Sequence, residues 1–124
     1  MVNFSLEGKV ALVTGASYGI GFALATAFAR QGAKIVFNDI KQELVDKGLA
    51  AYKEVGIVDI LVNNAGIIKR IPMVEMTAAE FRQVIDIDLN GPFIVSKAVI
   101  PSMIKKGKGK IINICSMMSE LGRE

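Results

Sequence analysis

The feature that most constrains the fold of this chain is a turn that contains three glycines. Residues 14–21 read Thr-Gly-Ala-Ser-Tyr-Gly-Ile-Gly, between an apolar run at residues 9–14 and an Ala- and Leu-rich segment at residues 22–31 that Gly32 ends. A buried strand, a tight turn and a helix are therefore expected in that order. Glycines in such a turn let the backbone approach a pyrophosphate, which the free N–H groups of the helix N-terminus can bind.

The turn therefore predicts a dinucleotide site. An ordinary glycine-rich connection between a strand and a helix is the alternative. A nucleotide P-loop is excluded, because no Gly-Lys-Ser/Thr sequence completes the turn. The residues of the turn that we expect to contact the cofactor are Gly15, Ser17, Tyr18, Gly19, Ile20 and Gly21.

Strand-like and helix-like segments alternate along the rest of the chain. The sequence Thr77-Ala78-Ala79-Glu80 matches a capping box that opens a helix. This alternation predicts an α/β fold, a doubly wound parallel sheet in a Rossmann-like three-layer αβα arrangement. Residues 1–124 are expected to form one partial dinucleotide-binding domain. Further strands are expected at residues 33–38, 59–63 and 110–116, and further helices at residues 41–54 and 90–106.

The connection between Asp39 and Asn63 is shorter than this fold requires. It has room for one helix, whereas the strand order 3-2-1-4-5-6 needs two helices and a strand at that place. A gap near Glu54–Val55 is the interpretation we favour, and a compact variant of the fold is the alternative. The sequence ends at Glu124, soon after the last expected strand, so a missing C-terminal part is also expected.

Composition narrows the class of protein. Hydrophobic residues make up 52% of the chain, which argues against disorder. No apolar run approaches the roughly 20 residues that span a bilayer, and the N-terminus does not resemble a secretory signal. Cys115 is the only cysteine, so no internal disulfide can form, and a reducing cytoplasm is expected.

Four lysines lie within residues 105–110. They could contact nucleic acid, but a solvated loop is favoured, and neither a nucleic-acid partner nor a metal site is expected.

Asp39 follows the second expected strand, about 20 residues past the glycines. A carboxylate at this place can accept hydrogen bonds from the adenosine ribose hydroxyls and would repel a 2′-phosphate. The cofactor is therefore expected to be NAD or NADP, with NAD slightly favoured. Lys41 could reduce the penalty against NADP, and capping the segment at residues 41–54 is the alternative role for Asp39.

A second motif, Asn63-Asn64-Ala65-Gly66, follows the expected strand at residues 59–63. Together with Thr-Gly-x-x-x-Gly-x-Gly at residues 14–21, it resembles the short-chain dehydrogenase/reductase family. The resemblance extends over essentially the whole chain, but only over about the first half of a typical member. It implies an oxidoreductase that transfers a hydride between nicotinamide and a secondary alcohol or ketone. It also implies that Asn64, Ala65 and Gly66 border the cofactor.

The resemblance implies two catalytic residues. The family has an asparagine at the position of Asn90, where it holds a water in a proton relay; a helix cap is the alternative role. The family ends the last of these strands with a serine that hydrogen-bonds the substrate oxygen. Ser116 is favoured for this role, with Ser119 as an alternative, while Cys115 is expected to be buried. The Tyr-x-x-x-Lys pair of the family is not found in this sequence.

Within the family, residues 37–40, 64–70 and 114–120 resemble the gluconate 5-dehydrogenases. That resemblance implies a polyol or sugar-acid substrate, such as the pair D-gluconate and 5-dehydro-D-gluconate. By charge alone, Lys69, Arg70 and Arg123 are candidates to bind its carboxylate, although a surface charge is the favoured alternative for each. The resemblance also implies a homotetramer with the helix at residues 90–106 in one interface. The alternative function is a catalytically silent nucleotide-binding or scaffold protein, which would hold if these 124 residues were the whole gene product.

Overall fold

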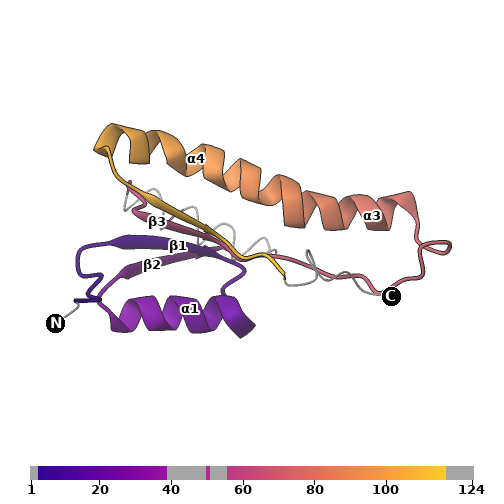
Figure 1. The fold of residues 1–124 in the computed structure, drawn as a ribbon, viewed down its shortest axis with the longest axis horizontal. Coiled ribbons are helices and arrows are strands. Elements are labelled where there is room, and N and C mark those ends of the chain that lie inside the picture. The colour runs from indigo at the N-terminus through magenta and orange to yellow at the C-terminus, as the bar shows by residue number, and fades with distance from the viewer. Residues whose placement is uncertain (1–2, 39–49, 51–55, 117–124) are drawn as a thin grey trace.

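The computed structural model describes residues 3–38, 50 and 56–116 of the chain (Figure 1). The helix expected at residues 41–54 and the possible gap at Glu54–Val55 therefore fall almost entirely outside the described residues. Asp39, Lys41, Ser119 and Arg123 lie outside them as well.

The described strands form one parallel sheet in the order β2-β1-β3-β4. The strands β2 and β3 follow one another in the described chain but lie on opposite sides of β1. The order of the strands therefore reverses its direction at β1, and ligands of such sheets bind at this switch point. The expected doubly wound, Rossmann-like sheet is confirmed. The bounds of the strands are β1 Val10–Thr14, β2 Lys34–Asn38, β3 Ile60–Asn63 and β4 Lys110–Asn113.

Helices lie on both faces of the sheet. Helix α1 (Gly19–Arg30) covers one face and α4 (Gly91–Lys106) covers the other (Figure 1). Helix α3 (Ala78–Ile85) opens with the capping box predicted between Thr77 and Glu80, so that prediction is confirmed. A π-helical turn, η1 (Asp86–Asn90), joins α3 to α4 without a break.

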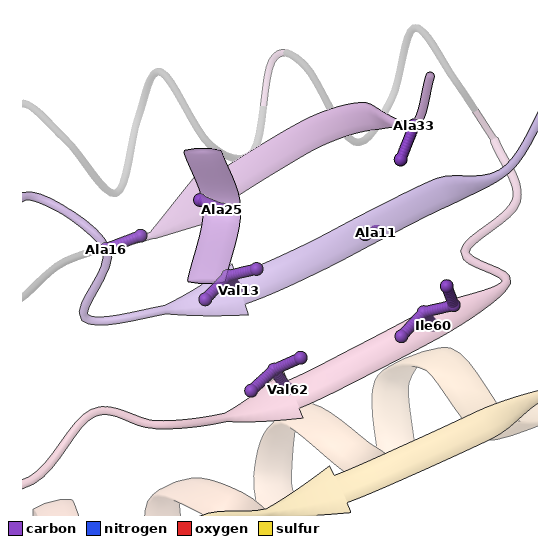
Figure 2. Close-up of a cluster of buried hydrophobic side chains, with 7 residues drawn as sticks. All are labelled: Ala11, Val13, Ala16, Ala25, Ala33, Ile60 and Val62. Carbon is purple, nitrogen blue, oxygen red and sulfur yellow. The ribbon is translucent and has the colours of Figure 1, made fainter. Parts of the chain in front are cut away.

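Side chains that alternate along the strands supply two separate cores, because successive residues of a strand point to opposite faces. The α1 face carries small residues, chiefly alanines and valines, so α1 can approach the sheet closely (Figure 2). The α4 face carries larger side chains, including Leu61 and Met103. The members of the first core are Ala11, Val13, Ala16, Ala25, Ala33, Ile60 and Val62, and those of the second are Leu12, Val36, Val58, Leu61, Val99 and Met103.

Strand β4 is shorter than the sequence predicted. It ends at Asn113 rather than at residue 116, because its partner β3 ends at Asn63, which pairs with Asn113. One further backbone bond, from Ile114 N to Asn63 O at 3.0 Å, closes the ladder. Ser116 therefore lies three residues past the strand and does not form its last residue.

The expectation that Cys115 is buried is wrong, since this cysteine is exposed. It follows β4, which is the outermost of the described strands on its side of the sheet and whose four residues are all exposed. Nothing among the described elements therefore covers the segment in which Cys115 lies.

At the amino ends of the strands, Asp59 directly precedes β3 and bonds to the first residues of β1 and β4. Its backbone N–H donates to Val10 O and its carbonyl accepts from Lys110 N, both at 2.9 Å. Its carboxylate accepts the Val10 N–H at 2.9 Å and forms an ion pair with Lys106. Burial alone raises the pKa of Asp59, but hydrogen bonds from Lys106 and Val10, together with the charges of Lys106 and Lys9, bring that pKa below its ordinary value of 3.8.

We expect Asp59→Asn to lower the free energy of unfolding near neutral pH by about 1.5–3 kcal/mol, the usual contribution of a hydrogen bond to a charged group. Because the folded-state pKa of Asp59 lies below the unfolded one, the carboxylate stabilises the fold above pH 3.8, and this contribution is lost as the pH falls through the folded value. Urea unfolding at a series of pH values should therefore show the wild type and the variant converging under acid conditions. Glu7→Gln removes an exposed carboxylate and is the control. A difference that persists unchanged at low pH would contradict the assignment.

Candidate cofactor site

The glycine turn begins with Gly15, directly after β1. Gly15 has a φ of +63°, in the left-handed region that favours glycine. A Cβ atom at this position would also lie 2.8 Å from the Cα atom of Ala65, closer than side chains pack. Gly15 is therefore required both for the direction of the turn and for the close approach of the segment that follows β3.

Gly21 is required for a different reason. It lies in the first turn of α1 and is buried. A Cβ atom there would overlap the carbonyl oxygen of Gly15 and the side-chain amide of Asn64. Only a residue without a side chain lets the first turn of α1 pack against the glycine turn and the end of β3.

Thr14 and Asn64 bind the two turns to each other. The Thr14 hydroxyl oxygen accepts the backbone N–H groups of Asn64 and Ala65, each at 3.0 Å. The Asn64 side-chain amide donates to the carbonyl oxygens of Thr14 and Gly15, at 3.1 and 3.2 Å. The two motifs that the sequence analysis identified separately are thus one hydrogen-bonded unit at the carboxyl ends of β1 and β3.

An open cleft of about 160 Å³ lies at this unit. It occupies the switch point between β1 and β3, where α/β sheets bind their ligands. Helix α1 points its N-terminus into the turn, with no acidic residue in its first turn and no side-chain capping bond from its N-cap residue, Tyr18. The lining residues are Gly15, Tyr18, Gly19, Ile20, Asn64, Ala65, Gly66 and Ile67.

These features fit the pyrophosphate of a dinucleotide. Unpaired N–H groups and the positive end of the helix dipole favour an anion, and the positions a side chain would fill are glycines. The structure brings seven of the predicted cofactor residues together in the lining, with Ser17 in the same turn and Gly21 behind it. Sequence reasoning assigned no role in the site to two residues, Thr14, which begins the first motif, and Ile67, which follows the second.

A polar cluster around the buried Asn63 lies at the same end of the sheet. The side-chain amide of Asn63 donates to Asn113 Oδ1 at 2.9 Å and to Ser96 Oγ at 3.2 Å. Asn63 itself is only 5% exposed, whereas Ser96 is half-buried and Asn113 is exposed. The bonds join β3, β4 and α4. The cluster fixes the end of β4, from which the chain continues to Ser116. The sequence analysis did not assign Asn113 or Ser96 to the site.

Asn90 lies in the π-helical turn, and its amide donates to Asp86 Oδ1 at 2.8 Å. The alternative role of Asn90 as a side-chain helix cap is wrong, because its side chain makes no capping bond and the helix continues through it. The proton-relay role of Asn90 stays a prediction, as does the catalytic role of Ser116, which is exposed. Lys69 is half-buried and Arg70 is exposed, both shortly after Ile67.

Two classes of feature are absent from the described part of the chain. No helix among residues 3–38 and 56–116 is long and apolar enough to cross a membrane. Nor do the described residues contain a group of three or more His, Cys, Asp or Glu side chains that could hold a metal ion.

Comparison with known proteins identifies the family. The sequence model of the short chain dehydrogenase family matches residues 9–56 and 49–124, which together include both glycine motifs. The chain belongs to the short-chain dehydrogenase family. The resemblance inferred from residues 14–21 and Asn63-Asn64-Ala65-Gly66 is therefore confirmed.

Named relatives lie within one part of this family. The chain is 45% identical to the 2-dehydro-3-deoxy-D-gluconate 5-dehydrogenase of Formosa agariphila over 97% of the chain and 56% of that protein. It is 67% identical to the crystal structure of 2-keto-3-deoxy-D-gluconate dehydrogenase from Streptococcus agalactiae, with a TM-score of 0.72, over 98% of the chain and 56% of that one. It is 36% identical to gluconate 5-dehydrogenase from Burkholderia cenocepacia J2315, solved in complex with NADP and tartrate, with a TM-score of 0.83, over 98% of the chain and 58% of that one.

These matches confirm the expected resemblance to gluconate 5-dehydrogenases. The chain spans a little over half the length of the relatives that it matches.

Proposed function

We propose that this chain forms the dinucleotide-binding part of an NAD(P)-dependent oxidoreductase that acts on a sugar acid. The cleft between the glycine turn and the Asn64-Ala65-Gly66 segment carries the proposal, because it presents the N-terminus of a helix and side-chain-free backbone at the switch point of the sheet. The relatives support the substrate class, since their names specify gluconate or a keto-deoxy-gluconate.

In this proposal, the bound nicotinamide supplies the hydride chemistry, and the residues of the chain bind and orient the reactants. The N-terminal N–H groups of α1 hold the pyrophosphate, and Asn64, Ala65 and Gly66 border the cofactor. The Ser116 hydroxyl donates a hydrogen bond to the oxygen of the substrate. Asn90 positions a water in the path of the proton. Lys69 and Arg70 follow the cleft residue Ile67 in the chain and are the described candidates for the carboxylate of a sugar acid.

The alternative, a catalytically silent nucleotide-binding or scaffold protein, is less well supported. It would use the same cleft, but the relatives at 36–67% identity described above are all named as dehydrogenases. No observation favours the silent function specifically.

The domain organisation is also a proposal. The described strands correspond to positions 2-1-4-5 of the order 3-2-1-4-5-6, so position 3 would lie beside β2. We infer that residues of a longer crossover are missing near Glu54–Val55. The family model matches the chain in two segments, which overlap at residues 49–56, and this division supports the inference.

Tetramer formation and a cytoplasmic location complete the proposal. The outer side of α4 exposes Phe93, Ile94 and Ile104, each by more than half of its surface. An apolar helix face of this kind is suited to an interface with another subunit. The single exposed thiol, Cys115, would stay reduced in the cytoplasm.

Isothermal titration of the intact protein with NAD⁺ and NADP⁺ tests the cofactor site. We expect micromolar binding of at least one of them, with NAD⁺ preferred in binding and in kcat/KM, because a carboxylate at Asp39 would repel a 2′-phosphate. A higher kcat/KM with NADP⁺ would indicate that Asp39 acts as a cap and not as a ribose ligand. If neither dinucleotide binds, the proposed function is wrong. Turnover of D-gluconate and of keto-deoxy-gluconates by the intact protein then tests the substrate class.

A further inference from the structure

Asp88 reaches from the π-helical turn to the wall of the cleft. Its Oδ1 atom accepts the backbone N–H of Ile67 at 2.8 Å, although the two residues are 21 positions apart in the sequence. The same oxygen lies against Gly66, where an added Cβ atom would be 3.6 Å from it. Both Gly66 and Ile67 line the cleft, so the carboxylate of Asp88 supports part of its wall from outside.

Asp88 has a different bonding partner from its two polar neighbours in the π-helical turn. Turns of this kind are rare, and they occur frequently at functional sites. In η1, the Asp86 carboxylate and the Asn90 amide bond to each other along the helix, whereas Asp88 bonds across to the segment that follows β3. Of these three polar side chains, Asp88 is the one with a bond to a residue of the cleft.

Two anchors then hold the segment from Ala65 to Ile67. The Ala65 N–H is bound by the Thr14 hydroxyl at 3.0 Å, and the Ile67 N–H is bound by Asp88 at 2.8 Å. Gly66, between them, has no side chain to restrict its backbone. The conformation of this wall of the cleft therefore depends on both anchors, of which Thr14 is buried in the sheet and Asp88 is exposed.

We propose that Asp88 is a positioning residue for the dinucleotide, which holds the backbone of Gly66 and Ile67 in the conformation that borders the cofactor. This inference rests on the proposed function. Asp88 lies outside the hydrophobic cores, and the Thr14 anchor is unaffected by its replacement, so Asp88→Ala changes the cleft and leaves the fold intact.

Three variants of the intact protein test this. Asp88→Ala removes the acceptor, Asp88→Asn keeps an oxygen in the same place, and Asp86→Ala removes a carboxylate from the same turn that contacts only Asn90 in the bonds described above. Hydrogen–deuterium exchange, followed by mass spectrometry of a peptide that covers residues 64–70, reports the Ile67 N–H. Titration with NAD⁺ and NADP⁺ reports the cleft.

We expect faster exchange in this peptide and a threefold to tenfold loss of dinucleotide affinity in Asp88→Ala. Affinity should stay within about twofold of wild type in Asp88→Asn, because an oxygen remains to accept the Ile67 N–H, and in Asp86→Ala, because that bond is untouched. Unchanged affinity in Asp88→Ala, or an equal loss in Asp86→Ala, would overturn the inference while leaving the proposed function standing. If the unmodified protein binds neither dinucleotide, the proposed function fails, and the inference fails with it.

Discussion

A Gly21→Val variant of the intact protein is expected to bind its nicotinamide dinucleotide at least tenfold more weakly than the wild type, a loss of about 1.4 kcal/mol or more. The reason is steric, because the Cβ atom would overlap the Gly15 carbonyl oxygen and the Asn64 side-chain amide. Asn64 could yield only by breaking its bonds to the carbonyl oxygens of Thr14 and Gly15. The glycine turn and the first turn of α1 would then separate, and the N–H groups proposed to bind the pyrophosphate would lose their arrangement.

Graded variants make this prediction specific. Gly21→Ala adds only the overlapping Cβ atom, so most of the loss should already occur with alanine. Gly91→Ala is the matched control, since Gly91 is also helical but an added Cβ atom would lie 3.5 Å from its nearest neighbour, the Asp86 carbonyl oxygen. Isothermal titration gives the affinities, and circular dichroism selects the variants that remain folded. Wild-type affinity in a folded Gly21→Val variant would remove this turn from the cofactor site.

The sequence predicted the features that depend only on residues close together in the chain. The glycine turn, the capping box at Thr77 and Glu80, and the buried strands all depend on local geometry and on the alternation of side chains, and the structure agrees with them. The Asn63-Asn64-Ala65-Gly66 motif was recognisable by resemblance. That Asn64 binds the carbonyl oxygens of Thr14 and Gly15 could not be predicted, because those partners lie about fifty residues away in the sequence.

Other features depend on pairing between distant elements. The end of β4 is set by the end of β3 at Asn63, which the apolar run at residues 110–116 does not encode. The exposure of Cys115 follows from the position of β4 in the sheet. The π-helical turn requires i→i+5 bonds that no local pattern in Asp86–Asn90 predicts, so the contact between Asp88 and Ile67 was not foreseen.

Ser116 has the largest predicted effect on the chemistry. In the intact protein, Ser116→Ala is expected to lower kcat on the order of 100-fold or more, about 3 kcal/mol, while leaving cofactor affinity nearly unchanged. Ser116 lies at the carboxyl edge of the sheet beyond β4, whereas the pyrophosphate is proposed to bind at the turn after β1. Loss of its hydroxyl would therefore remove a donor to the reacting oxygen and not a contact to the phosphates.

Steady-state kinetics and dinucleotide titration together separate these effects, and two other serines serve as comparisons. Ser102→Ala is a control on α4, where the hydroxyl of this half-buried serine donates to the Val99 carbonyl oxygen at 2.8 Å. It should leave kcat within about twofold, because Ser102 does not line the cleft. Ser119→Ala should cost far less than Ser116→Ala, because residue 119 lies farther along the chain from the end of β4. If Ser119→Ala proves the damaging change and Ser116→Ala the mild one, the two serines have been assigned in the wrong order. If neither changes kcat, the serine assignment falls altogether. If the intact protein shows no turnover at all, a silent dinucleotide-binding protein becomes the better account of the cleft.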